Sequence, residues 1–385
     1  MRKKAIVAMS GGVDSSVAAY LMQQAGYEVS GAIMKLFDTN SAQNEKGKLR
    51  GTDNIEDARK VADRLGIELG VFDMRPEFRA EVIERFIAAY EGGQTPNPCV
   101  FCNKKLKFED LYNKAASLPD EINPGADDDG LTGEESSEDK AVIATGHYAV
   151  IEYDEKSGRY KLKKAADSAK DQSYFLYTLS QEQLSRTVFP LGALNKQEVR
   201  AIAEEQGFVT AKKKESQDIC FIPDGDYAAF IEGYTGCDYP AGDFVDEEGN
   251  VMGSHKGIIN YTVGQRKGLG LALKKPAYVL RLDAENNRVV LGDNETLFKR
   301  ELTARDFNWL STDAPDGPIR ASARIRYRHR EAPCEIIPLT EAEPDSGDFI
   351  RRVRIVFDEP QRAITRGQSV VIYDGEYVLG GGIIE

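Results

Sequence analysis

The chain lacks two features that would place it in or across a membrane. No apolar run approaches the roughly 18 residues that a membrane-spanning helix needs. Residues 1–4 lead straight into a predicted strand and show no signal-peptide pattern. Cysteine is scarce as well, since five residues in 385, an odd number, do not suit a framework of structural disulfides. We therefore expect a cytoplasmic protein that makes no membrane contact and whose thiols are reduced or reactive.

The sequence also lacks the GxxxxGK[ST] loop, so no Walker lysine is predicted and ordinary γ-phosphoryl transfer is not indicated. It has a different loop instead. Residues 10–16, Ser-Gly-Gly-Val-Asp-Ser-Ser, follow the apolar run 5–9 and precede apolar residues at helical spacing, which predicts a buried strand, a tight turn and a helix. Main-chain N–H groups at the glycines, serine hydroxyls and a helix N-terminus together favour phosphate binding. The structural alternative is a serine- and glycine-rich turn without a ligand.

Acidic residues outnumber basic ones, with a formal net charge of −13, which argues at first against a nucleic-acid partner. However, nine acidic residues and no basic one lie between residues 120 and 139, in a composition typical of a disordered surface loop. Arginines recur at 324, 326, 328 and 330, and we expect them to alternate along one strand and contact phosphates. The alternative is a solvated edge strand.

Alternating strand and helix patterns over the first half predict an α/β fold with a parallel sheet, whose ligands bind at the carboxyl ends of the strands. Later segments are short, glycine-rich and strand-like, at intervals typical of an antiparallel barrel. We expect three domains: an α/β domain at 1–215 that contains the loop at 10–16 and carries the acidic loop at 120–139, a small β-rich domain at 216–280, and a C-terminal β-barrel at 281–385.

The cysteines fall into two groups. Cys99 and Cys102 form a CxxC on a loop rich in proline and asparagine, and Cys220 lies in a second polar segment. No second CxxC or HxxxH pair accompanies them, so a structural zinc site is disfavoured. Cys237 and Cys334 have no such context and are expected to be inert. A thiol reaction needs one sulfur to carry or attack and another to resolve, which makes the first three cysteines candidates for chemistry.

The loop at 10–16 resembles the PP-loop of the N-type ATP pyrophosphatases, which cleave ATP between the α and β phosphates. Six motifs in order (SGGVDSS, TPNPCVFCN, ATGHYA, KDQSYFLYTLSQEQL, KESQDICFI and YTVGQRKGLG) make the chain similar to the tRNA-specific 2-thiouridylases. The resemblance implies a transferase that adenylates the C2 oxygen of the wobble uridine, position 34 of tRNA, and replaces that oxygen with sulfur from a protein persulfide. The products are 2-thiouridine, AMP and pyrophosphate.

The resemblance also implies roles for individual residues. Cys102 corresponds to the nucleophile and Cys220 to the persulfide carrier, with a disulfide between them after transfer, and Asp14 lies near the metal-bound pyrophosphate. The implied ATP-binding residues are Ala8, Met9, Ser10, Gly11, Gly12, Val13, Asp14, Ser15, Met34 and Gly146. Those that meet the target base are Asn97, Pro98 and Cys99, and those that contact tRNA are His147, Lys170, Asp171, Gln172, Arg326, Tyr327 and Gln368.

The implied cofactors are ATP and Mg²⁺ brought by ATP. Some members of the family have Asp where this chain has Cys99, so a third thiol could resolve a disulfide or help Cys102 and Cys220 hold an iron–sulfur cluster. The implied partners are tRNA and a persulfide donor, either a sulfur-relay protein or a cysteine desulfurase. The alternative function is a PP-loop ATP pyrophosphatase that ligates or amidates a small molecule without tRNA.

Overall fold

The computed structural model describes residues 2–37, 50–117, 141–213, 219–342 and 349–385. The predicted acidic loop at 120–139 lies outside them. Within these ranges, no helix combines the length and the apolar composition needed to span a bilayer. The chain divides into two compact units. The first comprises Met1–Val82, Val100–Glu215 and Glu376–Val378, and the second comprises Ile83–Cys99, Ser216–Gly375 and Leu379–Glu385.

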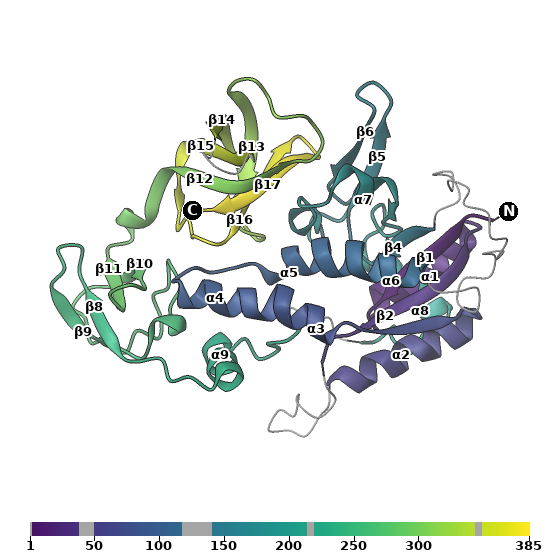
Figure 1. The fold of residues 1–385 in the computed structure, drawn as a ribbon, viewed down its shortest axis with the longest axis horizontal. Coiled ribbons are helices and arrows are strands. Elements are labelled where there is room, and N and C mark those ends of the chain that lie inside the picture. The colour runs from purple at the N-terminus through teal and green to yellow at the C-terminus, as the bar shows by residue number, and fades with distance from the viewer. Residues whose placement is uncertain (1, 38–49, 118–140, 214–218, 343–348) are drawn as a thin grey trace. The chain divides into compact units, whose positions relative to one another are not determined.

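A five-stranded parallel sheet organises the first unit (Figure 1). Val7 of the first strand pairs with Gly31 on one side and with Ala144 on the other, and all neighbouring strands run in the same direction. The parallel sheet predicted from the alternating patterns is therefore confirmed. The strands lie in the order β3 (Leu69–Asp73), β2 (Glu28–Lys35), β1 (Lys4–Met9), β4 (Val142–Thr145) and β7 (Thr187–Val188).

Three helices share one hydrophobic core with this sheet: α1 (Val13–Gln24), α2 (Arg50–Leu65) and α8 (Lys196–Glu205). Val17, Val61 and Val199, one from each helix, are almost fully buried there. Helix α8 begins at a capping box in which Asn195 accepts hydrogen bonds from the first helical turn and Glu198 reaches back. The remaining elements of the unit include α3 (Arg75–Phe78), α6 (Tyr112–Ala116), β5 (Val150–Asp154), β6 (Arg159–Lys163), η3 (Ser173–Phe175) and α7 (Gln181–Ser185).

The prediction that the CxxC lies on a loop is wrong, because α5 (Pro98–Phe101) leads directly into the π-helix η2 (Cys102–Leu111). A second segment, η1 (Arg79–Glu84), is π-helical as well. A π-helix bonds each N–H to the carbonyl five residues back, so it is wider than an α-helix, and such segments are frequent at functional sites. Two side chains hold η2, one from α7 and one from the residue that follows α7. Gln183 donates to the carbonyl of Lys104, and Arg186 donates to the carbonyl of Phe108. Cys102 is the first residue of this wide helix.

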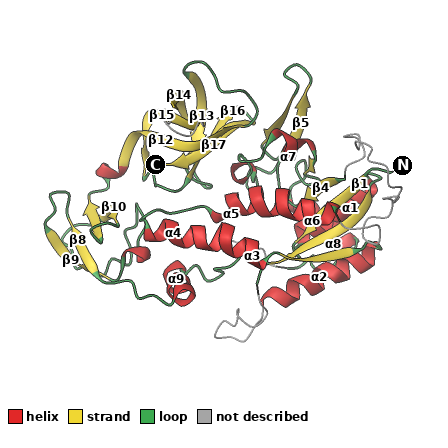
Figure 2. Cartoon of the chain, viewed as in Figure 1, coloured by secondary structure: helices red, strands yellow, loops and turns green. Residues whose placement is uncertain are grey.

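The second unit contains a four-stranded sheet in the order β10 (Tyr278–Asp283), β11 (Arg288–Gly292), β8 (Gly242–Val245) and β9 (Val251–His255). It also holds α4 (Arg85–Glu91), α9 (Tyr227–Thr235) and the short turns η4 (Ile258–Asn260) and η5 (Glu295–Leu297). Figure 2 shows β8, β9 and β10 as strands of this region, and each strand of the sheet has four to six residues. This small β-rich region agrees with the predicted fold class.

Six antiparallel strands form a closed barrel, because β12 pairs with both β15 and β17. Alternate residues of β12, such as Leu302 and Ala304, point into a core that also contains Phe307, Ile355 and Val370. The predicted C-terminal antiparallel barrel is confirmed. Its strands are β12 (Phe298–Trp309), β13 (Ile319–Arg324), β14 (Ala332–Ala342), β15 (Phe349–Arg362), β16 (Ser369–Asp374) and β17 (Tyr377–Ile384).

The prediction of arginines alternating along one strand is wrong. Strand β13 ends at Arg324, and the chain then turns, with the N–H of His329 bound to the carbonyl of Arg326. The Arg324 guanidinium pairs with Glu331 at 2.8 Å and lies over the ring of Tyr373. Arg326 and Tyr327 therefore lie in a turn rather than on a barrel face.

Candidate active site

The loop after β1 is held by its own serine hydroxyls. Ser15 Oγ donates to the carbonyl of Gly12 at 3.1 Å and accepts from the N–H of Ser10, and Ser10 Oγ lies 3.2 Å from Ser15 Oγ. Ser16 Oγ also donates to the Gly12 carbonyl and accepts from Thr210. Among the described residues, Gly12 caps α1 without a side-chain hydrogen bond. A helix N-terminus with serine hydroxyls beside it is an arrangement that suits an anion.

At two positions of the predicted ATP set, a residue larger than glycine would collide with neighbouring backbone. Gly11 has a φ of +67°, and a Cβ at this position would collide with the backbone of Asn54. A Cβ on Gly146 would lie 2.7 Å from the carbonyl carbon of Asp14 and 2.7 Å from the nitrogen of Ser15. The carboxyl end of β4 therefore packs directly on the first turn of α1.

The other predicted ATP residues lie along the same edge of the sheet. Ala8 and Met9 end β1, and Met34 is the penultimate residue of the neighbouring β2. The register aligns Met9 with Ile33, so Met34 lies one residue beyond the last paired position of β1. In a parallel sheet the carboxyl ends of adjacent strands share an edge, which brings these residues to the loop.

Asp14 has two partners that the sequence did not indicate. Lys196 Nζ lies 2.6 Å from Asp14 Oδ1, and the hydroxyl of Tyr148 donates to the same oxygen at 2.8 Å. Only 12% of the Lys196 side chain is exposed. The lysine follows the cap of α8, 182 residues after Asp14. A buried cation thus lies beside the phosphate loop even though no Walker lysine is present.

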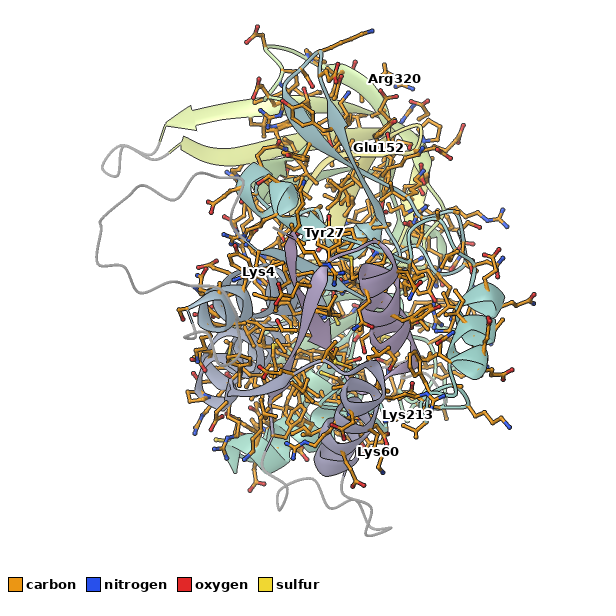
Figure 3. The ribbon with its side chains drawn as sticks, turned by 90° about the vertical axis from the view of Figure 1, so that its right-hand side faces the viewer. Lys4, Tyr27, Lys60, Glu152, Lys213 and Arg320 are labelled. Carbon is orange, nitrogen blue, oxygen red and sulfur yellow. The ribbon has the colours of Figure 1, made fainter. Side chains whose placement is uncertain are left out.

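Lys213 is a second cation at this loop (Figure 3). Its Nζ donates to the carbonyl of Gly11 at 2.9 Å and pairs with Asp57 of α2 at 2.6 Å. It also donates to the side chain of Asn54. Lys213 therefore ties the loop to α2, a contact that the sequence did not indicate.

The predicted tRNA contacts of the KDQ segment are connected to Tyr148. Gln172 accepts a hydrogen bond from the N–H of Tyr148 through its side chain and donates one to the Tyr148 carbonyl through its backbone. Asp171 is 3% exposed, and its carboxylate accepts from the N–H groups of Ala165 and Ser173. Lys170 is half-buried in the turn before them. Of the three residues, Asp171 therefore stabilises the turn through its buried carboxylate.

His147 is packed between two aromatic rings. Its ring lies 5.9 Å from those of Phe108 and Phe189, and Nδ1 is 2.7 Å from the hydroxyl of Thr145. Burial, together with the nearby charge of Lys107, lowers the pKa of His147 well below its ordinary value. The imidazole is therefore neutral at physiological pH, and its contact with tRNA stays a prediction.

The Cys102 thiol is buried at the start of η2. Burial raises its pKa, and the positive charge of Lys107 opposes that effect. Lys107 Nζ donates to Asn103 Oδ1 at 2.8 Å, and Asn103 in turn donates to the carbonyl of Phe175. Lys107 is thus the cation whose charge favours a thiolate at Cys102.

The segment predicted to meet the target base belongs to the second unit up to Cys99. The N–H of Thr95 donates to the carbonyl of Arg366, and Gln368 Nε2 donates to the carbonyl of Thr95 at 2.8 Å. Gly367, with a φ of +87°, faces Gln94. Three consecutive barrel residues thus hold the chain just before Asn97, Pro98 and Cys99, and the Cys99 side chain is exposed.

Cys220 is exposed as well, and the residue after it provides the anchor. The ring of Phe221 packs edge-on against Phe86 of α4 at 5.4 Å and against Phe230 of α9 at 5.2 Å. Tyr90 and Tyr227 extend this aromatic cluster. The backbone that carries Cys220 therefore rests on the helix that leads to the Cys99 segment. All five cysteines are free thiols.

Three family models together match most of the chain. They are described as the tRNA methyl transferase HUP domain (residues 3–125 and 131–224), the tRNA methyl transferase PRC-barrel domain (228–293) and the aminomethyltransferase beta-barrel domain (299–384). A protein from Clostridioides difficile (strain 630) named tRNA-specific 2-thiouridylase MnmA is 47% identical over 385 residues, which cover 100% of this chain and 99% of that protein. The chain belongs to the tRNA-specific 2-thiouridylase family.

Other family members are similar over the same length. The proteins of the same name from Acetivibrio thermocellus and Geotalea uraniireducens are each 47% identical, over 100% of this chain and 99% and 95% of their own lengths. The resemblance stated from six sequence motifs is confirmed.

The described side chains bear on the metal chemistry of this family member. Among them, no group of three or more His, Cys, Asp or Glu is arranged to hold a metal ion. Asp14 and the loop hydroxyls fit an ion of another kind, because Mg²⁺ commonly takes one or two carboxylates together with substrate phosphates and water.

Proposed function

We propose that this chain is an ATP-dependent tRNA uridine 2-sulfurtransferase. The observation that carries the proposal is the 47% identity to proteins named tRNA-specific 2-thiouridylase over the whole length of the chain. The matched models have names that refer to methyl transfer. The names of the relatives apply to the full chain, whereas each model describes one part of it. The proposed activity therefore rests on the relatives.

The first step is adenylation of the uracil C2 oxygen at position 34. That oxygen attacks the α-phosphorus of ATP, the bond to the bridging oxygen of the β-phosphate breaks, and pyrophosphate leaves. We assign to the N–H groups at the start of α1 and the hydroxyl of Ser10 the role of stabilising the negative charge that develops on the phosphates. Lys196 can release Asp14 and turn to the phosphates when Mg²⁺ and ATP enter. Mg²⁺ supplies Lewis-acid chemistry at the phosphates.

The second step exchanges oxygen for sulfur. The terminal sulfur of a persulfide on Cys220 attacks C2, and AMP leaves with the original oxygen. The Cys102 thiolate then attacks the Cys220 sulfur, which breaks the persulfide S–S bond, leaves the outer sulfur on C2 and forms a Cys102–Cys220 disulfide. In the alternative order, the Cys102 thiolate first attacks the Cys220 sulfur and frees hydrosulfide, which then attacks C2. The products are the same. An external dithiol then reduces the disulfide, and a persulfide donor protein reloads Cys220.

The tRNA contacts follow from the chemistry of the base. A wobble uridine is reachable only when it is splayed from its neighbours, so we propose that Asn97, Pro98 and Cys99 receive the flipped base. Lys170, Gln172, Arg326, Tyr327 and Gln368 are proposed to contact the tRNA around it, and His147 to lie against it as a neutral imidazole. Asp171 acts by shaping the KDQ turn, because its carboxylate is buried and already accepts hydrogen bonds.

The test is thiolation of a transcribed tRNA by the full chain with ATP, Mg²⁺, a cysteine desulfurase with cysteine, and a dithiol. We expect 2-thiouridine by mass spectrometry of the digested tRNA, and AMP and pyrophosphate in equal amounts. Cys220→Ser and Cys102→Ser should abolish 2-thiouridine, whereas Cys237→Ser, which removes another exposed thiol, should not. Asp14→Ala should stop pyrophosphate release.

Two outcomes contradict the proposal. Pyrophosphate release that needs a small molecule and is indifferent to tRNA would favour the ligase or amidotransferase alternative. Unchanged 2-thiouridine with Cys220→Ser would remove that residue from the sulfur path. A visible absorption spectrum after anaerobic purification checks the cluster separately, because an iron–sulfur band lost in Cys99→Ser would require a metal-based route.

A further inference from the structure

Four exposed cations lie on a single loop of the second unit, between η4 and β10. They are Arg266, Lys267, Lys274 and Lys275. Within the part of the chain that the structure describes, none of their charged groups forms a hydrogen bond or an ion pair. Residues 257–282 contain no Asp or Glu at all, in a chain whose formal net charge is −13. We call residues 266–275 the basic loop.

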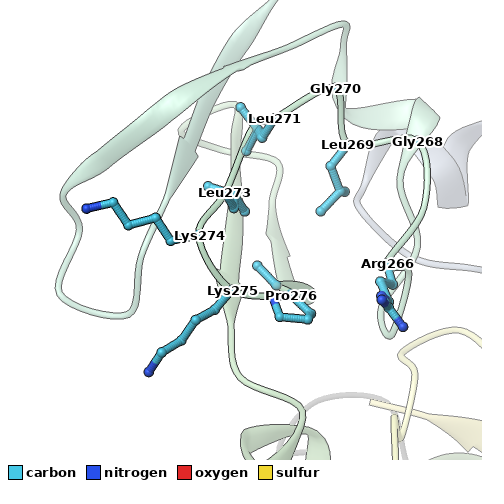
Figure 4. Close-up of a pocket in the computed structure, with 10 residues that line it drawn as sticks. Arg266, Gly268, Leu269, Gly270, Leu271, Leu273, Lys274, Lys275 and Pro276 are labelled. Carbon is cyan, nitrogen blue, oxygen red and sulfur yellow. The ribbon is translucent and has the colours of Figure 1, made fainter.

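The basic loop surrounds a hollow of about 400 Å³ (Figure 4). Arg266 lies on one limb, and Lys274 and Lys275 extend from the other. Leu271 and Leu273, both half-buried, line the space between the limbs. The hollow therefore combines cations at its rim with apolar surface inside, and no carboxylate lines it.

Hydrogen bonds hold the start of the basic loop in place. The N–H of Gly264 donates to the carbonyl of Val279, and the N–H of Val279 donates to the carbonyl of Gln265. The Gln265 side chain accepts from the N–H of Thr262 and donates to the carbonyl of Lys267. These bonds hold the first limb against the start of β10.

Two glycines leave the loop open to a ligand. Gly268 and Gly270 have φ values of +77° and +71°, a conformation that favours glycine. A Cβ at Gly270 would meet no atom within 4 Å, and one at Gly268 would meet only the end of the Gln265 side chain at 3.7 Å. A bulky anion can therefore approach the main chain here.

We propose that the basic loop is a second tRNA-binding surface that holds backbone phosphates and takes no part in handling the base. The proposal rests on the proposed function. A phosphodiester strand presents a row of single negative charges that can meet cations on both limbs at once. A folded protein surface intersperses both signs of charge, and the basic loop has no acid to match them. RNA thus fits better than an acidic donor protein.

The experiment measures the Kd of transcribed tRNA for the full chain at several NaCl concentrations. The variants are Arg266→Gln/Lys267→Gln, Lys274→Gln/Lys275→Gln and all four together. Lys156→Gln/Lys299→Gln is the matched control, since both lysines are exposed and lie outside the loop. The four-fold variant should bind tRNA about ten-fold more weakly, and its slope of log Kd against log salt should fall by about 2 to 4. Each double variant should give about half of that change.

The outcomes separate the two proposals. If the wild type forms 2-thiouridine but the four-fold variant keeps the wild-type salt slope, the basic loop does not bind tRNA. If that variant instead loses persulfide transfer from the donor at unchanged tRNA affinity, the surface belongs to the donor protein. If the wild type forms no 2-thiouridine, the proposed function fails while the salt slopes still report on the loop. Should the four-fold variant fold poorly by circular dichroism, the double variants decide by the same criteria.

Discussion

The side-chain amide of Gln368 donates a hydrogen bond to the backbone carbonyl of Thr95, with 2.8 Å between Nε2 and O. The two residues are 273 positions apart, and the same amide lies 3.5 Å from the carbonyl of Pro96. A barrel residue thus fixes the segment that leads to Asn97, Pro98 and Cys99. The position of the proposed base-binding residues therefore depends on a residue near the other end of the chain.

Gln368→Ala should free that segment. A hydrogen bond between neutral groups contributes about 1 kcal/mol, so we expect tRNA thiolation to fall roughly five- to ten-fold in kcat while ATP affinity is unchanged. Gln368→Glu should be at least as severe, because a carboxylate cannot donate to the Thr95 carbonyl. Single-turnover thiolation at saturating tRNA measures the effect. A loss confined to tRNA affinity would leave Gln368 only its proposed contact with tRNA, and unchanged thiolation would exclude both roles.

Gly146→Ala should disturb the phosphate loop directly. The added Cβ would lie 2.7 Å from backbone atoms of Asp14 and Ser15, which cannot give way without moving the first turn of α1. We expect ATP affinity to fall at least ten-fold by calorimetry. Gly233→Ala is the control, because a Cβ there meets nothing within 4 Å and α9 should gain slightly in stability. Equal ATP affinity in both variants would show that the close packing at Gly146 does not affect ATP binding.

Lys196→Ala should lower the stability of the protein more than the substitution of a surface lysine does. It removes a charge-assisted hydrogen bond from Asp14 that is worth about 2 kcal/mol. We expect a lower melting temperature and loss of ATP-induced stabilisation. Lys60→Ala is the matched control, because its pair with Glu56 is largely exposed and contributes well under about 1 kcal/mol. If ATP raises the melting temperature of Lys196→Ala as much as that of the wild type, Lys196 has no part in the phosphate site.

The reactivity of the Cys102 thiol should depend on its burial and on the positive charge of Lys107. Because burial raises its pKa, Cys102 stays protonated at neutral pH, and alkylation by iodoacetamide should keep accelerating into alkaline pH. Lys107→Gln should slow alkylation at each pH by raising the pKa further, while Lys107→Arg should not. Peptide mass spectrometry distinguishes Cys102 from the exposed Cys99. Lys104→Gln, an exposed lysine on the same helix, is the control. Identical pH profiles for Lys107→Gln and the wild type would exclude the influence of Lys107.

Mild acid should destabilise the protein through its histidines. Burial lowers the pKa of all three, His147, His255 and His329. The folded chain therefore binds fewer protons than the unfolded chain below the ordinary histidine pKa of about 6.5. Stability is full above that value and falls as the pH drops through it. The melting temperature should decline between pH 7.5 and 5.5, and less steeply in His147→Gln. The same decline in His147→Gln would exclude this histidine as a source.

Local pattern was enough to predict the elements that surround the phosphate loop. Apolar spacing at Val13 and Val17, and the unbroken apolar run from Ala5, determine a helix and a buried strand whatever follows them. Parallel neighbours then bring their carboxyl ends to one edge, which is why Gly146 could be placed near Asp14 from sequence. The barrel strands followed in the same way from short alternating segments.

Tertiary structure alone decided which distant side chains complete the site. Lys196 and Lys213 reach the loop from 182 and 202 residues away, and Gln368 reaches Thr95 from 273. The Arg324 segment leaves its strand, and Ile83–Cys99 joins the second unit, because packing partners and not local periodicity set those positions. Backbone periodicity is a short-range property that the sequence displays, whereas a contact between remote residues depends on how the packed elements are oriented, which no local pattern encodes.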